Sequence, residues 1–167
     1  ERLHRLGFVA PFRPVLAAAR CVGPNDALSY IELLKACERF SFLVYRVAGC
    51  RPNAGRSWLF RLGRQVFQRK VDVKSAAASV ASAIGWYCHK PTYDRFFGID
   101  RENPTSFYEW GGIRYLLYEW EIHLAGQKQV MLSWRELHQR QPKATIEHVL
   151  PQTPVDRPGT FRRKGDS

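Results

Sequence analysis

A carboxylate and an imidazole stand next to each other near the end of the chain, at Glu147 and His148. Histidine titrates near neutral pH and can take a proton from water, and a neighbouring carboxylate can bind a divalent cation. Hydrolysis of a phosphodiester needs both functions, because water must be activated and charge on the phosphoryl group offset. In a strand, adjacent side chains point to opposite faces. The two groups can therefore serve one site only where the chain bends, and Pro151 is consistent with a bend.

Spacing alone is a weak signal for this pair, since an isolated Glu-His pair in a loop is more often solvated or structural. The peptide around it is more specific. The segment from Ile146 to Gln152 resembles the first half of the HNH (ββα-metal) motif in the C-terminal nuclease domain of GmrSD-type, type IV restriction endonucleases. Residues 107–121 look like the helix that precedes the motif in that family, in the expected order and separation. The resemblance covers most of residues 1–153.

The resemblance implies that His148 is the general base and that Glu147 binds a divalent metal, Mg²⁺ or alternatively Mn²⁺. Pro151 and Gln152 would shape the loop between them and the next element. The implied function is a fragment of a metal-dependent DNA endonuclease that cuts foreign or modified DNA. The family also requires a later Asn and a later His, and neither residue type follows His148. We therefore expect an incomplete motif and little cleavage by this chain alone, because the metal and the base lose their supporting groups.

The charge of the chain favours a polyanionic partner. The formal net charge is +11 and the isoelectric point is near 9.9, and Lys and Arg that neutralise phosphates release condensed counterions. Arg56, Arg61 and Arg64 are candidate contacts to DNA phosphates, although a solvated face is the commoner role for any one such arginine. The alternative function is a non-catalytic basic helical module that binds DNA or a partner protein, for example the family's nucleotide-dependent domain. The sequence contains no glycine-rich phosphate loop, so we predict no nucleoside triphosphate site in this chain.

Several classes of protein are disfavoured. The apolar runs are too short to span a bilayer and the N-terminus does not have the zones of a signal peptide, so we expect a cytoplasmic protein without membrane contact. The four cysteines form no CxxC pair, which favours buried free thiols over a zinc ribbon or a disulfide framework. The chain begins at Glu1 and its only methionine is Met131. We interpret it as a truncated, frameshifted or trimmed product.

The predicted fold class is mainly α: a helical domain followed by an incomplete ββα-metal motif. The expected organisation is a helical region over 1–138, the first half of the motif over 139–153, and a disordered tail over 154–167 that is rich in Pro, Gly and charge. Most of the residues between Asn25 and Gly126 should be helical.

Periodic apolar residues and capping signals locate the helices. The predicted ranges are 24–49, 56–70, 75–88 and 111–126, and a short turn opened by the capping box Ser133-x-x-Glu136. Asn25 or Asp26 should cap the first range, and its apolar positions at helical spacing include Leu28 and Ile31. In the second, the side chains expected to point inward are Trp58, Leu59, Leu62 and Val66, and those expected outward are Arg61, Arg64 and Gln68. Pro91 is predicted to end the third.

The fourth helix carries an apolar stripe and many aromatic residues. The stripe consists of Ile113, Leu116, Leu117, Trp120 and Leu124. The aromatic residues are Tyr108, Trp110, Tyr115, Tyr118 and Trp120. Their helical spacing favours a place in the core over a platform for stacking bases.

Overall fold

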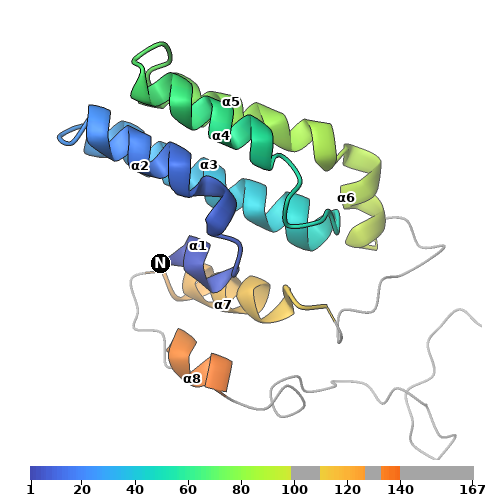
Figure 1. Ribbon diagram of the computed structural model, residues 1–167. Helices are drawn as coiled ribbons and strands as arrows, with labels where there is room; N and C mark the ends of the chain where they lie inside the picture. Colours follow the sequence, from blue (N-terminus) through green and yellow to red (C-terminus); the bar gives the residue numbers. More distant parts are fainter. Residues whose placement is uncertain (99–109, 127–132, 140–167) are drawn as a thin grey trace, which may run out of the picture. The chain divides into compact units, whose positions relative to one another are not determined.

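The computed structural model describes residues 1–98, 110–126 and 133–139 of the chain (Figure 1). Every regular element in these ranges is a helix, which confirms the mainly helical class and the helices expected between Asn25 and Gly126 wherever that span is described. The first half of the ββα motif and the predicted disordered tail lie outside the described residues. The chain consists of two compact units, Glu1–Leu124 and Ala125–Ser167. None of the described helices has both the length and the apolar character needed to cross a bilayer.

The described part of the chain contains ten helical elements. In chain order they are α1 (Arg2–Arg5), the 3₁₀ turn η1 (Ala10–Phe12), α2 (Arg13–Val22), α3 (Ala27–Phe40), the π-helical segment η2 (Ser41–Val47), α4 (Arg56–Phe67), α5 (Val73–Tyr87), α6 (Lys90–Phe96), α7 (Ile113–Ala125) and α8 (Trp134–Gln139). The last of these belongs to the second unit.

Four helices form the core of the first unit. α3 packs along α5 and α2 packs along α4, and Figure 1 shows the four lying side by side. The small side chains of the alanine-rich helix α5 allow close packing, since Ala76, Ala77 and Ala83 are buried in the core. Larger side chains such as Phe12 and Phe40 fill the remaining space and meet edge to face, with ring centroids 5.7 Å apart.

Local capping interactions begin the helices. The side chain of Asp26 accepts a hydrogen bond of 3.1 Å from the Ser29 amide at the start of α3, and Asp72 does the same for α5. In the second unit, the predicted capping box is confirmed. Glu136 accepts a 2.8 Å bond from the Ser133 amide, and its own amide donates to Ser133 Oγ over 3.3 Å. These contacts join residues three apart, which is why the sequence could predict the Asp26 and Ser133–Glu136 interactions; the Asp72 cap was not predicted, since that helix was expected to begin at residue 75.

The helix predicted over 24–49 differs from the structure in two ways. α3 gives way at Ser41 to a π-helical segment, in which the Ala48 amide donates to the carbonyl of Leu43 over 2.9 Å. Leu28 is also 79% exposed and Ile31 46% exposed, so these apolar positions do not mark the buried face. The buried side chains of α3 are those of Leu33, Ala36, Cys37 and Phe40, since this is the face that meets α5.

The prediction for Pro91 was wrong. α5 ends at Tyr87, and Pro91 stands in the first turn of the next helix, α6. Proline is tolerated there because the first amides of a helix have no partner within it, and the fixed φ of proline suits the helix.

Buried free thiols were predicted, and the structure confirms this for one cysteine. All four cysteines are free; Cys37 is buried, Cys50 and Cys88 are half-buried, and Cys21 is exposed. Burial raises the pKa of the Cys37 thiol to about 12. Cys37 is therefore a protonated core residue at neutral pH.

Candidate nucleic-acid interface

The predicted catalytic pair lies outside the described part of the chain. This holds for Glu147 and His148, and equally for the loop residues Pro151 and Gln152. Within residues 1–98, 110–126 and 133–139, no three His, Cys, Asp or Glu side chains come together as a metal site would require. The predicted DNA contacts Arg56, Arg61 and Arg64 lie within the described part of the chain, on α4.

The three arginines predicted to meet DNA all lie on the exposed side of α4. Leu59, Leu62 and Val66 are buried, which confirms the predicted inner face, whereas Trp58 is only half-buried. Arg56, Arg61 and Arg64 are exposed, as is Gln68. At about 100° per residue, the three arginine positions fall within an arc of about 140°. They can therefore face one ligand together.

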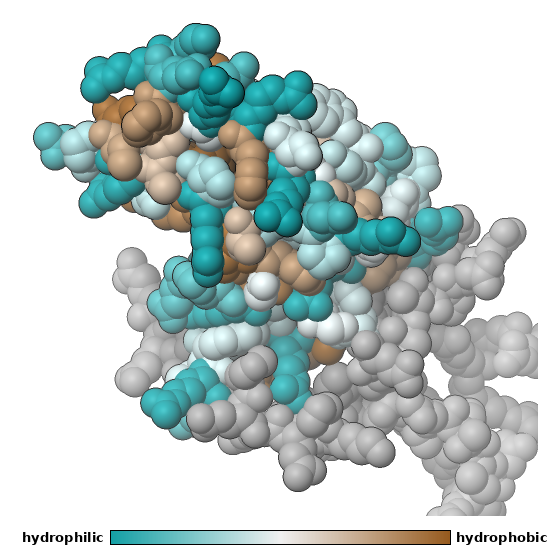
Figure 2. All heavy atoms as spheres, in the orientation of Figure 1, coloured by the Kyte–Doolittle hydropathy of each residue, from teal (hydrophilic) through white to brown (hydrophobic). Residues whose placement is uncertain are grey.

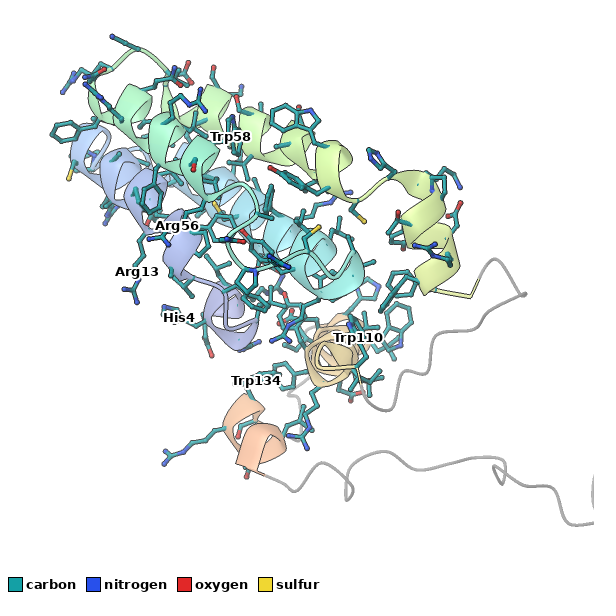
Figure 3. All side chains as sticks on the ribbon, turned by 45° about the vertical axis from the view of Figure 1, so that its right-hand side comes forward. His4, Arg13, Arg56, Trp58, Trp110 and Trp134 are labelled. Carbon is teal, nitrogen blue, oxygen red and sulfur yellow. The ribbon has the colours of Figure 1, made fainter. Side chains whose placement is uncertain are left out.

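α2 extends this basic surface. It lies against α4 so closely that a Cβ on Gly63 would come within 2.9 Å of the backbone at Pro14 and Val15. Arg13 and Arg20 of α2 are exposed, and Figure 3 shows the Arg13 side chain extending away from the helix. Neither α2 nor α4 contains an Asp or a Glu. The paired helices thus present arginines with no acidic residue of their own to offset them.

An apolar groove runs between the two helices. It has a volume of about 440 Å³ and is lined by Pro14, Ala17, Ala18, Cys21, Phe60, Gly63, Arg64 and Phe67. Phe60 and Phe67 are 39% and 63% exposed, and the Arg56 guanidinium lies 5.1 Å from the centre of the Phe60 ring. Figure 2 shows apolar atoms over this region bordered by hydrophilic ones. Cationic groups beside exposed rings suit a ligand with both phosphates and flat bases.

Two features of this region were not predicted from the sequence. They are the arginines of α2, Arg13 and Arg20, and a pair of tryptophans at the other edge of α4. Trp58 meets Trp86 of α5 with ring centroids 5.6 Å apart and planes at 74°, and Trp86 is 59% exposed. One signal for the basic surface was present in the sequence, since no acidic residue occurs between Glu1 and Asp26 or between Glu38 and Asp72. The Trp58–Trp86 contact carries no such signal, because it joins two helices.

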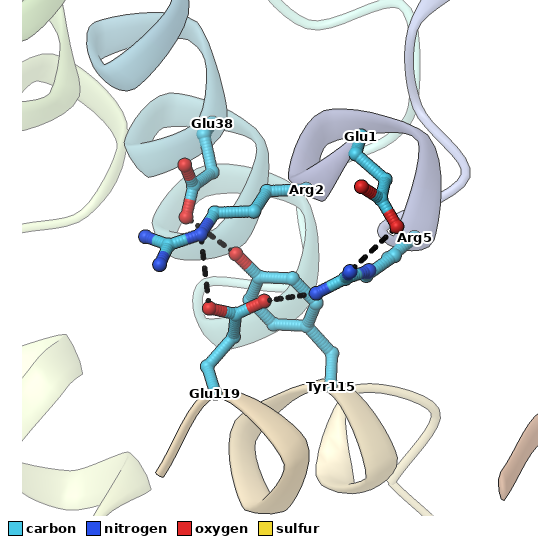
Figure 4. Close-up of polar contacts among 6 residues, drawn as sticks. All are labelled: Glu1, Arg2, Arg5, Glu38, Tyr115 and Glu119. Atoms are coloured by element: carbon cyan, nitrogen blue, oxygen red, sulfur yellow. Dashed lines mark hydrogen bonds and ion pairs between the residues drawn. The ribbon is translucent and has the colours of Figure 1, made fainter. Parts of the chain in front are cut away.

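A separate polar cluster connects α7 to the start of the chain (Figure 4). Glu119 accepts from Arg5 Nη1 over 2.8 Å and pairs with Arg2 Nε at 3.1 Å. Burial opposes the charge on Arg5, but hydrogen bonds to Glu1 and Glu119 outweigh it and raise the arginine's pKa. On the same face of α7, the buried Tyr115 hydroxyl donates to Glu38. Burial is the main cause that raises the pKa of Tyr115, and the hydrogen bond to Glu38 raises it further. The Tyr115 hydroxyl therefore stays protonated.

These contacts correct the prediction for α7. Its inward face is set by Tyr115 and Glu119, whereas the residues of the apolar stripe at Leu117, Trp120 and Leu124 are 46%, 56% and 64% exposed. Core burial of the aromatic cluster is confirmed only for Tyr115. Trp110 and Tyr118 are half-buried, and Tyr108 lies outside the described residues.

A comparison with protein-family models, with curated proteins and with solved structures finds no match for this chain.

Proposed function

We propose that this chain is the DNA-holding part of a metal-dependent DNA endonuclease of the HNH type, related to restriction enzymes. The observation that carries the proposal is the arginine surface of α2 and α4, which has no acidic residue on either helix. Such a surface attracts a polyanion at long range and releases counterions on contact, which gives affinity without sequence preference.

The dimensions of the surface suit a duplex. From Arg56 to Arg64 an α-helix rises by about 12 Å. This length corresponds to three or four base pairs at about 3.4 Å each. Phosphate contacts of this kind set the position of a protein on DNA and do not read its sequence. The three arginines are accordingly proposed as positioning contacts.

The catalytic part of the proposal rests on the peptide around Glu147 and His148. His148 would take the proton from the attacking water, and Glu147 would hold a divalent cation. A bound Mg²⁺ or Mn²⁺ would supply the charge that offsets the developing negative phosphoryl group. Pro151 and Gln152 would shape the loop that follows. This assignment depends on the motif alone.

The DNA-binding proposal can be tested with two double variants that remove equal charge. Arg61→Gln with Arg64→Gln should weaken binding of a duplex by at least about tenfold at low salt, because two phosphate contacts are lost. Lys35→Gln with Arg39→Gln removes two exposed charges from α3, outside α2 and α4. It should change the affinity less than about threefold. Equal losses in both variants, measured by fluorescence anisotropy, would show that net charge and not this surface controls binding.

The catalytic proposal needs a separate assay. This chain alone should nick plasmid DNA little, because its motif is incomplete. Joined to a downstream segment that supplies the family's later Asn and His, it should nick DNA only when Mg²⁺ or Mn²⁺ is present, and nicking should stop when the metal is chelated. His148→Ala should reduce the rate by about 10²- to 10⁴-fold, as expected for loss of a general base. Glu147→Ala should be partly rescued by a higher metal concentration. Metal-dependent nicking that persists in His148→Ala would remove His148 from the mechanism.

A second candidate is a DNA-binding module without catalytic activity. The observation that favours it is that the arginine surface lies entirely on α2 and α4 and needs no residue of the motif. This candidate predicts normal duplex binding by a chain in which both Glu147 and His148 are alanine, and no metal-dependent nicking even after the downstream segment is joined to the chain.

A further inference from the structure

A second cleft lies away from the α2–α4 surface, between α1, α3 and α7. It has a volume of about 510 Å³ and is lined by Arg2, Lys35, Glu38, Arg39, Phe42, Tyr115, Leu116, Glu119, Ile122 and His123. This volume is within the usual range for small-molecule sites, about 300–1,000 Å³. Figure 4 shows four of these lining residues, Arg2, Glu38, Tyr115 and Glu119, and the polar contacts among them.

Both carboxylates in the cleft already have partners. Glu38 accepts from the Tyr115 hydroxyl, and Glu119 accepts from Arg5 and Arg2. Because the Arg5 side chain is only 9% exposed, water screens its pairing with Glu119 poorly. A ligand cation would have to displace these donors. The cleft is therefore poorly suited to a metal ion or an amine.

Unlike the two carboxylates, the cationic side chains at the rim of the cleft can still bind a ligand. Lys35 and Arg39 are exposed, stand one turn apart on α3, and form no ion pair in the described part of the chain. Like charges at this spacing repel each other, and an anion between them would relieve the repulsion. Arg2 contacts Glu119 through Nε, and its side chain is 54% exposed. Its terminal N–H groups can donate to a further acceptor, since a guanidinium has several donors.

One wall of the cleft is apolar. It is lined by Phe42, Leu116 and Ile122, and the centroids of the Phe42 and Tyr115 rings are 5.6 Å apart. A flat apolar group of a ligand can pack against this wall while the charged end of the same ligand reaches the rim. We propose that the cleft binds a small aromatic phosphate, with its phosphate between Lys35, Arg39 and Arg2 and its ring against Phe42. This site is independent of the proposed DNA contacts.

The proposal is tested with adenosine monophosphate as the probe, and with adenosine and inorganic phosphate as its two halves. Titration of the isotopically labelled chain, followed by NMR, should shift amide signals of α3 near Lys35 and Arg39 and of α7 near Tyr115. The intact nucleotide should bind at least about tenfold more tightly than either half, because it uses the rim and the wall together. Lys35→Gln with Arg39→Gln should weaken it by at least about tenfold.

Arg61→Gln with Arg64→Gln is the matched control, since it removes the same charge from α4 and should leave nucleotide binding within about twofold of the unmodified chain. Circular dichroism checks that both variants are folded, and if either is not, the position of the shifted signals in the unmodified chain decides. Shifts confined to α2 and α4, equal weakening by both variants, or inorganic phosphate binding as tightly as the nucleotide would each overturn the proposal.

Discussion

At the scale of single residues, two ion pairs of similar length differ sharply in their surroundings. Arg5 and Glu119 are 2.8 Å apart, with side chains 9% and 17% exposed. Lys90 and Asp94 are 2.6 Å apart, but the lysine side chain is 84% exposed. Water competes with the second pair and scarcely with the first. Burial, rather than distance, should decide what each contributes to stability.

Glu119→Gln should therefore lower the free energy of unfolding by about 1.5–3 kcal/mol, because a poorly hydrated guanidinium loses its counter-charge. Asp94→Asn is the control and should cost about 0–1 kcal/mol, as exposed pairs do. Urea denaturation of both variants measures the difference. Equal and small effects would mean that α7 is held by its other contacts.

Asp72 links stability to pH through the cap of α5. Hydrogen bonds from the Ser75 amide and hydroxyl, at 2.8 and 2.7 Å, lower the pKa of its carboxyl. A lowered folded-state pKa means that the unfolded chain binds the proton more tightly. The stabilisation is thus complete above the ordinary Asp pKa of about 3.9 and is lost as the pH falls through the lowered value.

Asp72→Asn provides the test, since asparagine keeps an acceptor for the cap but does not titrate. The unmodified chain should be the more stable of the two at neutral pH, and the difference should disappear in acid. Stability curves measured against pH for both chains give the answer. A difference that stays constant down to acid pH would exclude the linkage.

At the scale of elements, the approach of α2 to α4 depends on a glycine. A Cβ at Gly63 would meet backbone atoms of α2 at 2.9 Å, and backbone cannot turn aside as a flexible side chain can. A glycine inside a helix is normally unfavourable by about 0.5–1 kcal/mol relative to alanine. Its presence here is explained by packing.

Gly63→Ala should consequently destabilise the chain by about 1 kcal/mol or more, because the overpacking cost exceeds the gain in helix propensity. Gly85 of α5 is the matched control. It is exposed and nothing lies within 4 Å of a Cβ placed there, so Gly85→Ala should stabilise by about 0.5–1 kcal/mol. Thermal unfolding should show shifts of opposite sign, and two shifts of the same sign would contradict the packing argument.

At the scale of the whole molecule, the net charge of +11 should appear as a salt dependence of DNA binding. Each phosphate neutralised contributes about −0.9 to the slope of log K against log salt. If Arg13, Arg20, Arg56, Arg61 and Arg64 all engage phosphates, the slope should approach about −4.5. Arg61→Gln with Arg64→Gln should reduce its magnitude by about 1.8.

Anisotropy titrations of one duplex between about 50 and 200 mM salt measure the slope, and a second duplex of unrelated sequence tests the lack of preference. A slope near zero, or strong discrimination between the two sequences, would argue against binding through phosphates.

The sequence by itself determined what depends on neighbours within a few residues. It predicted most of the helices, a cap at Asn25 or Asp26 that the structure places at Asp26, the Ser133–Glu136 capping box, and the outward arginines of α4. These follow from helical period and from hydrogen bonds between residues three apart. The assignment of Glu147 and His148 also rests on the sequence, since both lie outside the described residues.

Only the tertiary structure decided which face of each helix is buried and which distant groups meet. Leu28 and Ile31 have helical spacing, yet α5 covers the opposite face of α3. The inward face of α7 is set by the bond from Arg5 to Glu119, which spans 114 positions of sequence. A periodic pattern indicates that a helix has two different faces, but the element that packs against the helix decides which face is buried. That element is found only once the chain has folded.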